Sequence, residues 1–147
     1  MNVRKIIDAK GPDIVTVRPD LMMSAFAKIV VGQSVGAAPV TDENGKLLGV
    51  VSERDIVRGF DLYGVGLMEK SVGDLMTAEV VSCVPENSIS DVAELMRKHG
   101  IRHIAVLEDG ALVGFISIRD VAFNRLSELE LNNETLRVMF DNKEAVG

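Results

Sequence analysis

The chain contains the same short motif twice, and this repetition limits its fold more than any other feature of the sequence. "GVVSERD" runs from Gly49 to Asp55, and "GFISIRD" runs from Gly114 to Asp120. Both stretches begin with glycine and end in Ser-x-Arg-Asp. A motif repeated once at a long interval indicates two copies of one structural unit rather than a solenoid of many short repeats.

The similarity continues on both sides of the motif and brings the two copies into register. Pro19 and Pro85 lie 66 positions apart, and Val40 and Val106 keep the same spacing. The two motifs themselves lie 65 positions apart, so the second copy is one residue shorter between Val106 and its motif. This difference falls in an expected turn, where a change of one residue is easily tolerated. We therefore predict an internal duplication with two pseudo-symmetric halves.

Each half is predicted to have the order β-α-β-β-α, which makes the fold α/β. We assign residues 1–65 to the first half and residues 66–147, with a C-terminal helical tail, to the second. Apolar runs predict the first strand of each half at residues 14–17 and 80–84. One half has too few strands to cover its own apolar face, so the two halves are expected to pack together.

Turn and helix-end signals also occur in both halves. Asn44-Gly45 and Asp109-Gly110 predict hairpin turns, because the favoured turn types need positive φ. The helix that follows each first strand is predicted to end at Gly32 or at Gly100. The stretch after residue 125 is amphipathic, and its apolar residues are expected to complete the monomer or to cover a partner: Leu126, Leu129, Leu136, Met139 and Phe140.

Composition excludes several classes of protein. The formal net charge of -6 argues against sequence-independent binding to DNA or RNA, which needs Lys and Arg against phosphates. A single cysteine, Cys83, cannot form an internal disulfide, and the N-terminus has no apolar run typical of a secretory signal, so we expect a cytoplasmic protein. Residues 21–40 are nearly uncharged, but Gln33 and Pro39 interrupt them, which favours a buried helix and strand over a membrane span.

The Ser-x-Arg-Asp sequence after each expected strand allows two interpretations. In the structural one, the serine and the acid form a capping box at the start of a helix. In the functional one, the free amides at the helix start bind phosphate together with Ser52 or Ser117. A carboxylate one turn further, on Asp55 or Asp120, then accepts hydrogen bonds from ribose hydroxyls. Both copies keep the glycine, serine, arginine and acid, whereas capping alone does not require the arginine.

A duplicated β-α-β-β-α unit whose copies close on "DENGKLLGVVSERD" and "EDGALVGFISIRD" resembles the CBS domain, named for cystathionine β-synthase. Two such repeats in tandem resemble a Bateman module, and the resemblance covers nearly the whole chain. It implies an adenosine-containing ligand in clefts between the repeats. Carried over by position, the resemblance places ribose at Asp55 and Asp120, phosphate at Ser52 and Ser117, and adenine near Thr16, Ser82, Pro39 and Ile104.

The two clefts are expected to differ in charge. Before its second strand the second half reads "GIRHIAV", so Arg102 and His103 stand where "SVGAAPV" in the first half has glycine and alanine. In proteins of this kind basic residues here reach phosphate, although a buried histidine is also a common structural group. Arg54 and Arg119 either add charge to the phosphate sites or are solvated surface residues.

The sequence contains no P-loop, GxGxxG or zinc motif and no evident nucleophile–base pair, so we predict neither an enzyme nor a metal site. The resemblance implies a non-catalytic regulatory sensor of AMP, ADP, ATP or NAD. It would act as a homodimer, through ligand-dependent conformational change, on an unidentified protein. S-adenosylmethionine is an alternative ligand, but it carries no phosphate for the arginines. The rival interpretation is a structural dimerisation module whose clefts stay empty.

Overall fold

The computed structural model describes the backbone of residues 1–146 and the side chains of residues 1–139. The side chain of Phe140, expected on the apolar face of the tail, lies outside the described residues. The first part of the chain forms α1 (Val3–Lys10), α2 (Met23–Gln33), β1 (Ala37–Thr41), β2 (Leu47–Ser52), α3 (Glu53–Tyr63), η1 (Gly64–Glu69) and α4 (Val72–Leu75). The remainder forms β3 (Ser82–Cys83), α5 (Ile89–His99), β4 (His103–Glu108), β5 (Ala111–Ser117) and α6 (Ile118–Val146). The fold is thus mixed α/β, as predicted.

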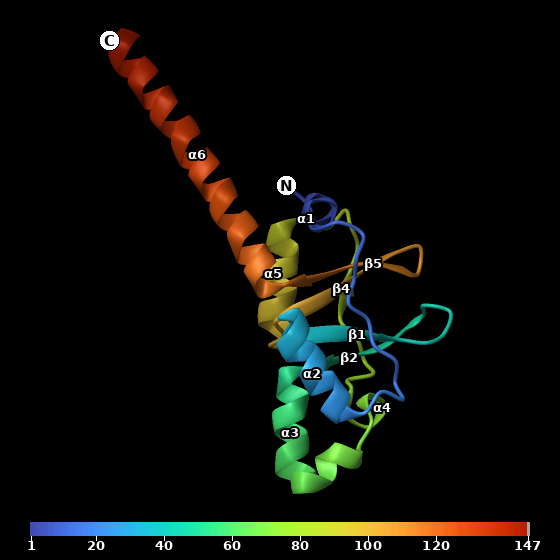
Figure 1. The fold of residues 1–147 in the computed structure, drawn as a ribbon. Coiled ribbons are helices and arrows are strands. Elements are labelled where there is room, and N and C mark those ends of the chain that lie inside the picture. The colour runs from blue at the N-terminus through green and yellow to red at the C-terminus, as the bar shows by residue number, and fades with distance from the viewer. Residues whose placement is uncertain (147) are drawn as a thin grey trace.

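Two antiparallel hairpins form the centre of the molecule, with the helices of one half above them and those of the other half below (Figure 1). The β1–β2 hairpin has a register shift after Val40, and the β4–β5 hairpin has one after Val106. These are the two valines that the sequence alignment matched. The turns confirm the hairpin prediction, because Gly45 and Gly110 have φ of 82° and 80°. The duplication is therefore visible in backbone geometry.

The first strand predicted in each half is shorter than expected, and in the first half it is almost absent. Residues 14–17 contribute one bridge, in which the Val17 amide donates to the Pro39 carbonyl at 3.0 Å and the Val17 carbonyl accepts from Thr41 at 2.9 Å. The next bond of a parallel ladder would need an amide hydrogen on Pro39, which proline lacks. The second half has alanine at the matching position, and there β3 pairs two residues with β4.

One helix end was predicted correctly and the other was not. Gly100 ends α5 in the left-handed region, with φ of 62°. Gly32 does not end α2, which continues to Gln33 and ends at Ser34 with φ of 53°. Ser34 and Gly100 lie 66 positions apart, so the stop occurs at equivalent positions in both halves although only one copy has glycine there.

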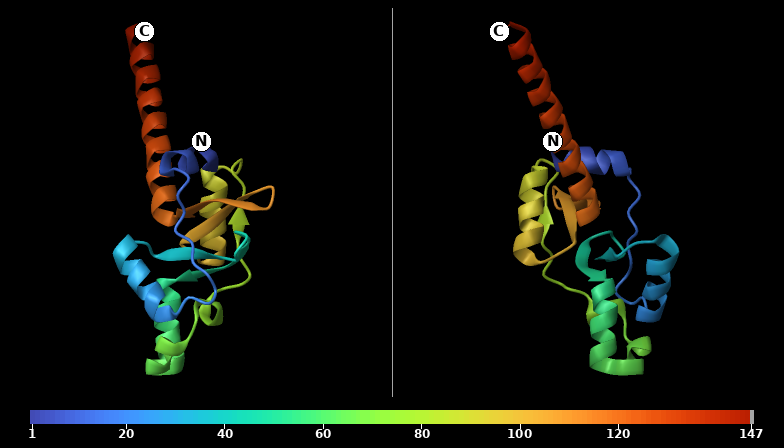
Figure 2. Two further views of the ribbon diagram at one scale, coloured as in Figure 1. Left: turned by 45° about the vertical axis from the view of Figure 1, so that its right-hand side comes forward. Right: turned by 90° about the vertical axis from the view of Figure 1, so that its left-hand side faces the viewer.

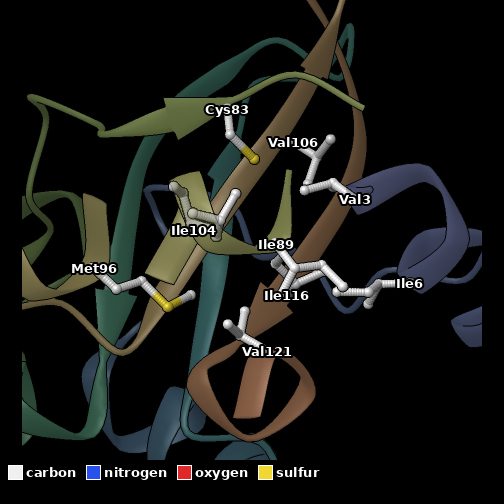
Figure 3. Packing of buried hydrophobic residues seen from close by; sticks show 10 residues of the cluster. Val3, Ile6, Cys83, Ile89, Met96, Ile104, Val106, Ile116 and Val121 are labelled. Carbon is white, nitrogen blue, oxygen red and sulfur yellow. The ribbon is translucent and has the colours of Figure 1, made fainter. Parts of the chain in front are cut away.

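Each half packs against the short helix that leads into the other half. Val3 and Ile6 of α1 are buried among the side chains of α5, β4 and β5, as Figure 3 shows. Val72 and Leu75 of α4 are buried in the other cluster, with α2 and the first hairpin. Figure 2 shows α1 lying beside the second half, away from α2 and α3. The predicted division at residue 65 stays a prediction, and the packing crosses it in both directions.

This exchange explains the glycine that begins each copy of the repeated motif. A Cβ on Gly49 would lie 2.8 Å from the Met76 sulfur, just after α4. A Cβ on Gly114 would collide with the Ile7 side chain of α1. Both glycines therefore allow a lead-in segment to cross the second strand of a hairpin at close range.

Among the described residues, no helix is both long enough and apolar enough to span a bilayer. No group of three or more His, Cys, Asp or Glu residues in this part of the chain could hold a metal ion.

Candidate functional site

Both copies of the repeated serine and acid form a cap at the start of a helix. The Ser52 amide donates to Asp55 Oδ2 at 2.8 Å, and the Ser117 amide donates to Asp120 Oδ2 at the same distance. The Asp120 amide in turn donates to Ser117 Oγ at 3.2 Å. The capping interpretation is therefore correct for the backbone. The cap uses Oδ2 of each carboxylate, so Oδ1 lies outside the cap in both halves, and in Asp55 it accepts from Arg58.

The loop before each hairpin is attached to the helix of its own half. The Glu53 amide donates to the Gly36 carbonyl at 2.9 Å, and the Ile118 amide donates to the Arg102 carbonyl at 2.7 Å. Gly36 and Arg102 therefore hold equivalent positions beside the two helix starts. A Cβ on Gly36 would lie 3.3 Å from His103 Cε1, so the equivalent loops of the two halves meet face to face.

A cavity of about 410 Å³ lies at the start of α3, and we name it the first cavity. Its lining combines Ser52, Arg54 and Asp55 with residues of the second half and of the segment that leads to it. From there come Thr77, Glu79, Val80, Val81, Ile101, Arg102 and His103. The volume lies within the range of about 300–1,000 Å³ that is usual for small-molecule sites.

The first cavity holds one buried acid and three arginines, with Glu53 and Glu79 also in its lining. Asp55 is 7% exposed, and its Oδ1 accepts from the Arg58 guanidinium at 2.9 Å. Arg58 also donates to the Leu75 carbonyl at 2.7 Å, which fixes it at the wall. Arg54 and Arg102 line the same cavity and are exposed. Arginines grouped in this way suit a phosphate, because each offers several N–H donors in one plane.

The equivalent position in the second half is smaller and contains a lysine. The second cavity, of about 170 Å³, is lined by residues that include Lys10, Ile14, Val15, Ala37 and Phe115. Lys10 Nζ donates to Asp120 Oδ2 at 2.7 Å and to the Phe115 carbonyl at 3.1 Å. Burial raises the pKa of the Asp120 carboxyl, but the bonds from Lys10 and Ser117 outweigh it and hold this pKa below its usual range.

The length of the lead-in helix explains the difference between the two positions. The helix that packs on the first half, α4, has four residues, and Thr77 then exchanges two backbone hydrogen bonds with Val50. The helix that packs on the second half, α1, has eight residues and ends at Lys10. The Lys10 ammonium therefore reaches the carbonyl of Phe115, which is the counterpart of Val50. Because α1 is one helical turn longer than α4, the Lys10 ammonium bonds to the carbonyl of Phe115, whereas the carbonyl of Val50 bonds to a backbone amide.

His103 forms a wall between the two cavities. It lines the first cavity, and its ring stacks on Phe115, which lines the second, with centroids 5.5 Å apart and planes 10° apart. Burial lowers the pKa of His103 below its usual range, and the nearby charge of Lys10 lowers it further. The imidazole is therefore neutral at pH 7. Because its ring stacks on Phe115, a movement of His103 at the first cavity would also affect a side chain that lines the second.

The structure brings some predicted site residues together and separates others. Those that line the first cavity are Ser52, Arg54, Asp55, Arg102 and His103. Asp120 bonds to Lys10, which lines the second cavity, and Ser117 bonds to Asp120. Arg119 is exposed on α6.

The four residues expected near adenine lie elsewhere. Thr16 and Ser82 are exposed, whereas Pro39 and Ile104 are buried. Within the described part of the chain, the linings of these two cavities do not include them. Residues slightly earlier along the same segments do line them, namely Val80 and Val81 in the first cavity and Ile14 and Val15 in the second.

Sequence reasoning missed Lys10 and Arg58. The signal for Arg58 was present, because an arginine three residues after an acid on a helix lies on the same face. No local signal marked Lys10, since its partner lies 110 residues away.

Cys83 is a structural residue. It is buried in the core of the second half, and burial raises the pKa of its thiol to about 11. The thiol therefore stays protonated at neutral pH and is a poor nucleophile.

Comparison with known proteins gives a consistent result. The CBS domain family model matches residues 4–61 and 72–126. A CBS domain-containing protein of Bacillus subtilis, YhcV, is 32% identical over 120 residues, covering 82% of this chain and 84% of the relative. The crystal structure of a CBS-domain-containing protein from Agrobacterium tumefaciens has a TM-score of 0.82 and 37% identity, covering 85% of this chain and 99% of that one. CBSX2 in complex with AMP has a TM-score of 0.70 and 26% identity, covering 83% and 96%.

Proposed function

The chain belongs to the CBS domain family, and from this premise we propose that it is a non-catalytic regulatory module that binds an adenine nucleotide in the first cavity. The observation that carries the proposal is the buried carboxylate of Asp55, which lies in a cavity together with three arginines. An acid that accepts from ribose hydroxyls beside cations that bind phosphate would recognise both polar parts of a nucleotide.

The first cavity also offers apolar surface for the base. Val80, Val81 and Ile101 line it, so a planar purine would pack against aliphatic side chains. The adenosine ligand is supported by CBSX2, whose structure contains AMP. In our assignment Asp55 holds the ribose, and Ser52 and Arg102 bind phosphate. AMP, ADP, ATP and NAD all present these groups.

The second cavity is proposed to bind nucleotide more weakly. A ribose at Asp120 would compete with the Lys10 ammonium, which is already bonded to Oδ2 of that carboxylate. A cavity of about 170 Å³ is also below the volume usual for such ligands, about 300 Å³ or more. Lys10 and the end of α1 must therefore move before this cavity can fill.

A ligand in the first cavity would contact both halves at once, because Asp55 comes from one and His103 from the other. Its binding would favour one arrangement of the halves over another, in proportion to its difference in affinity for the two. We propose that this change is passed on to a separate protein by a homodimer in the cytoplasm. The rival proposal, a structural module whose cavities stay empty, predicts no response to nucleotides.

A thermal-shift panel tests the proposed function. The purified full chain is heated with AMP, ADP, ATP, NAD, 2′-deoxy-AMP or S-adenosylmethionine. A ligand at 100 times its Kd should raise Tm by about 5 °C or more for a chain of this size. We expect 2′-deoxy-AMP to be weaker than AMP, because it lacks one hydroxyl for Asp55. No shift with any of the six, or equal shifts with AMP and its deoxy form, would contradict the proposal. Incubation with ATP should release no product.

A further inference from the structure

The C-terminal helix is much longer than the fold requires. α6 has 29 residues, and Val121 near its start is buried in the core of the second half. The family match ends at residue 126. In every view the rest of the helix runs away from both halves (Figures 1 and 2). The projecting part is therefore an addition to the family's fold in this chain.

The projecting part is rich in exposed apolar side chains, which a helix in water does not normally carry in such number. These are Leu126, Leu129, Leu131, Leu136, Val138 and Met139. Their exposure in the single chain indicates that something covers part of this surface.

The spacing of these residues defines a stripe. Leu126, Leu129, Asn133 and Leu136 follow one another at intervals of three, four and three residues. This is the a-d-a-d pattern of a two-stranded coiled coil. Val121 and Glu128 lie on a different side of the helix and contact the body of the protein, where Glu128 meets the N-terminal ammonium at 3.3 Å. The stripe therefore faces away from the chain's own body.

The polar residue in the stripe selects one kind of partner. A single asparagine at an a position favours a parallel, in-register dimer, where it pairs with its own copy. In an antiparallel pair an a position faces a d position, so Asn133 would face a leucine in an antiparallel arrangement. An identical helix, aligned at Asn133, thus satisfies the stripe.

The charges beside the stripe agree with this partner. Arg125 precedes the first a position and Glu130 follows the first d position, so they are g and e residues. In a parallel dimer the g residue of one helix meets the e residue five positions later on the other, which here joins opposite charges twice. In the single chain Arg125 bonds to Glu128 on its own helix at 3.3 Å. Such an exposed pair is weak, so Arg125 can exchange partners at little cost.

From this geometry we propose that the projecting part of α6 pairs with α6 of a second copy of this chain as a parallel, in-register coiled coil. Leu126, Leu129 and Leu136 form its seam, and Asn133 fixes the register. Leu131 lies on the outer side of the pair. The proposal is independent of the nucleotide, because it uses no residue of either cavity.

Sedimentation equilibrium of the full chain, without added nucleotide, tests the pairing. The wild type is expected to be dimeric. Leu129→Lys should weaken the dimer about 100-fold or more, since two buried leucines become like charges. Leu131→Lys, with the same change two residues away, should leave the Kd within about threefold because that side chain stays outside the seam. A monomeric wild type, or equal effects of the two substitutions, would overturn the proposal.

Cysteine cross-linking tests the orientation. Leu129→Cys places a thiol at a d position, within disulfide distance of its own copy in a parallel pair. Mild oxidation should therefore link this variant and leave Leu131→Cys largely unlinked. Cys83 stays in place, because it is buried, and the wild type controls for it. A dimer that links at residue 131 as readily as at residue 129 would show that another surface, or an antiparallel arrangement, joins the copies.

Discussion

Asp55 and Asp120 hold the same position in the two halves, one turn into a helix and capped by the serine before it, but different partners meet their carboxylates. Asp55 faces a cavity of about 410 Å³ and is bonded by Arg58 of its own helix. Asp120 adjoins a cavity of about 170 Å³ and is bonded by Lys10 from the far end of the sequence. The duplication has preserved the backbone while the chemistry around the acid has diverged.

The source of this divergence is a difference of one helical turn. α4 stops early and leaves its cavity open, whereas α1 continues to Lys10 and places an ammonium on the equivalent acid. The internal repeat therefore predicts the position of each site. Whether the site is open depends on the short helix that packs beside it. Four experiments test this difference between the halves.

The largest difference is expected between the two acids. Asp55→Asn should weaken AMP binding by about 10- to 100-fold, because the hydrogen bonds from ribose to a charged acceptor are worth about 1.5–3 kcal/mol. Asp120→Asn should change the affinity by less than about threefold, since that acid adjoins only the smaller, second cavity. Asparagine keeps an oxygen for the cap, so both variants should stay folded. Calorimetric titration gives the Kd values, and equal losses would show that the halves bind alike.

The second comparison concerns Lys10, which bonds to Asp120 beside the second cavity. Lys10→Met removes the ammonium from Asp120 Oδ2 while keeping an unbranched side chain, so a ribose no longer competes with that charge for the carboxylate. We expect AMP binding at the second cavity to improve by about 5- to 10-fold, the scale of a partly exposed ion pair. Lys5→Met, an exposed lysine on the same helix, is the control. If Lys10→Met instead weakened binding there, the lysine would be a ligand contact and not an obstacle.

The third comparison separates phosphate from adenosine. Arg102 lines the first cavity, and Arg119 is exposed on α6. Arg102→Ala should weaken AMP about 3- to 5-fold, as expected for an exposed charge, and leave adenosine unchanged. Arg119→Ala should affect neither ligand at this cavity. A loss of adenosine binding in Arg102→Ala would mean that the residue shapes the cavity and does not bind phosphate.

The smallest expected effect is a pH dependence of AMP binding at the first cavity, which His103 lines. Because the pKa of His103 lies below its usual range, the ring is neutral at pH 7 and gains a proton as the pH falls. The new positive charge favours a bound phosphate, so AMP affinity should rise by about two- to threefold from pH 7 to 5.5 relative to His103→Gln. The ligand's own phosphate titrates in the same range, and the variant corrects for it. Identical pH profiles would exclude His103 as the cause.

The sequence predicted the features that depend on local chemistry. The hairpin turns and the helix end at Gly100 follow from residues that act on their own backbone. The strand at residues 14–17 was overpredicted because Pro39, on another strand, removes the donor that would extend the ladder. The predicted helix end at Gly32 is wrong, because the residue that stops α2 in the left-handed region is Ser34.

Contacts between distant segments could not be predicted in this way. Lys10 meets Asp120 because α1 packs on the second half, and this depends on the buried positions of Val3 and Ile6. The cavity-lining valines were missed by one or two residues, because the side that faces the cavity is set by how the halves stack. The resemblance to a family identified the acids, but the size and charge of each cavity came from the packing.

A crystal structure of the full chain grown with AMP would show directly which of the two acids holds the ribose. Our account predicts adenosine in the first cavity, its ribose hydroxyls on Asp55 and its phosphate near Arg102, with the bond between Lys10 and Asp120 intact. AMP bound only at Asp120, with Lys10 displaced and the first cavity empty, would contradict it.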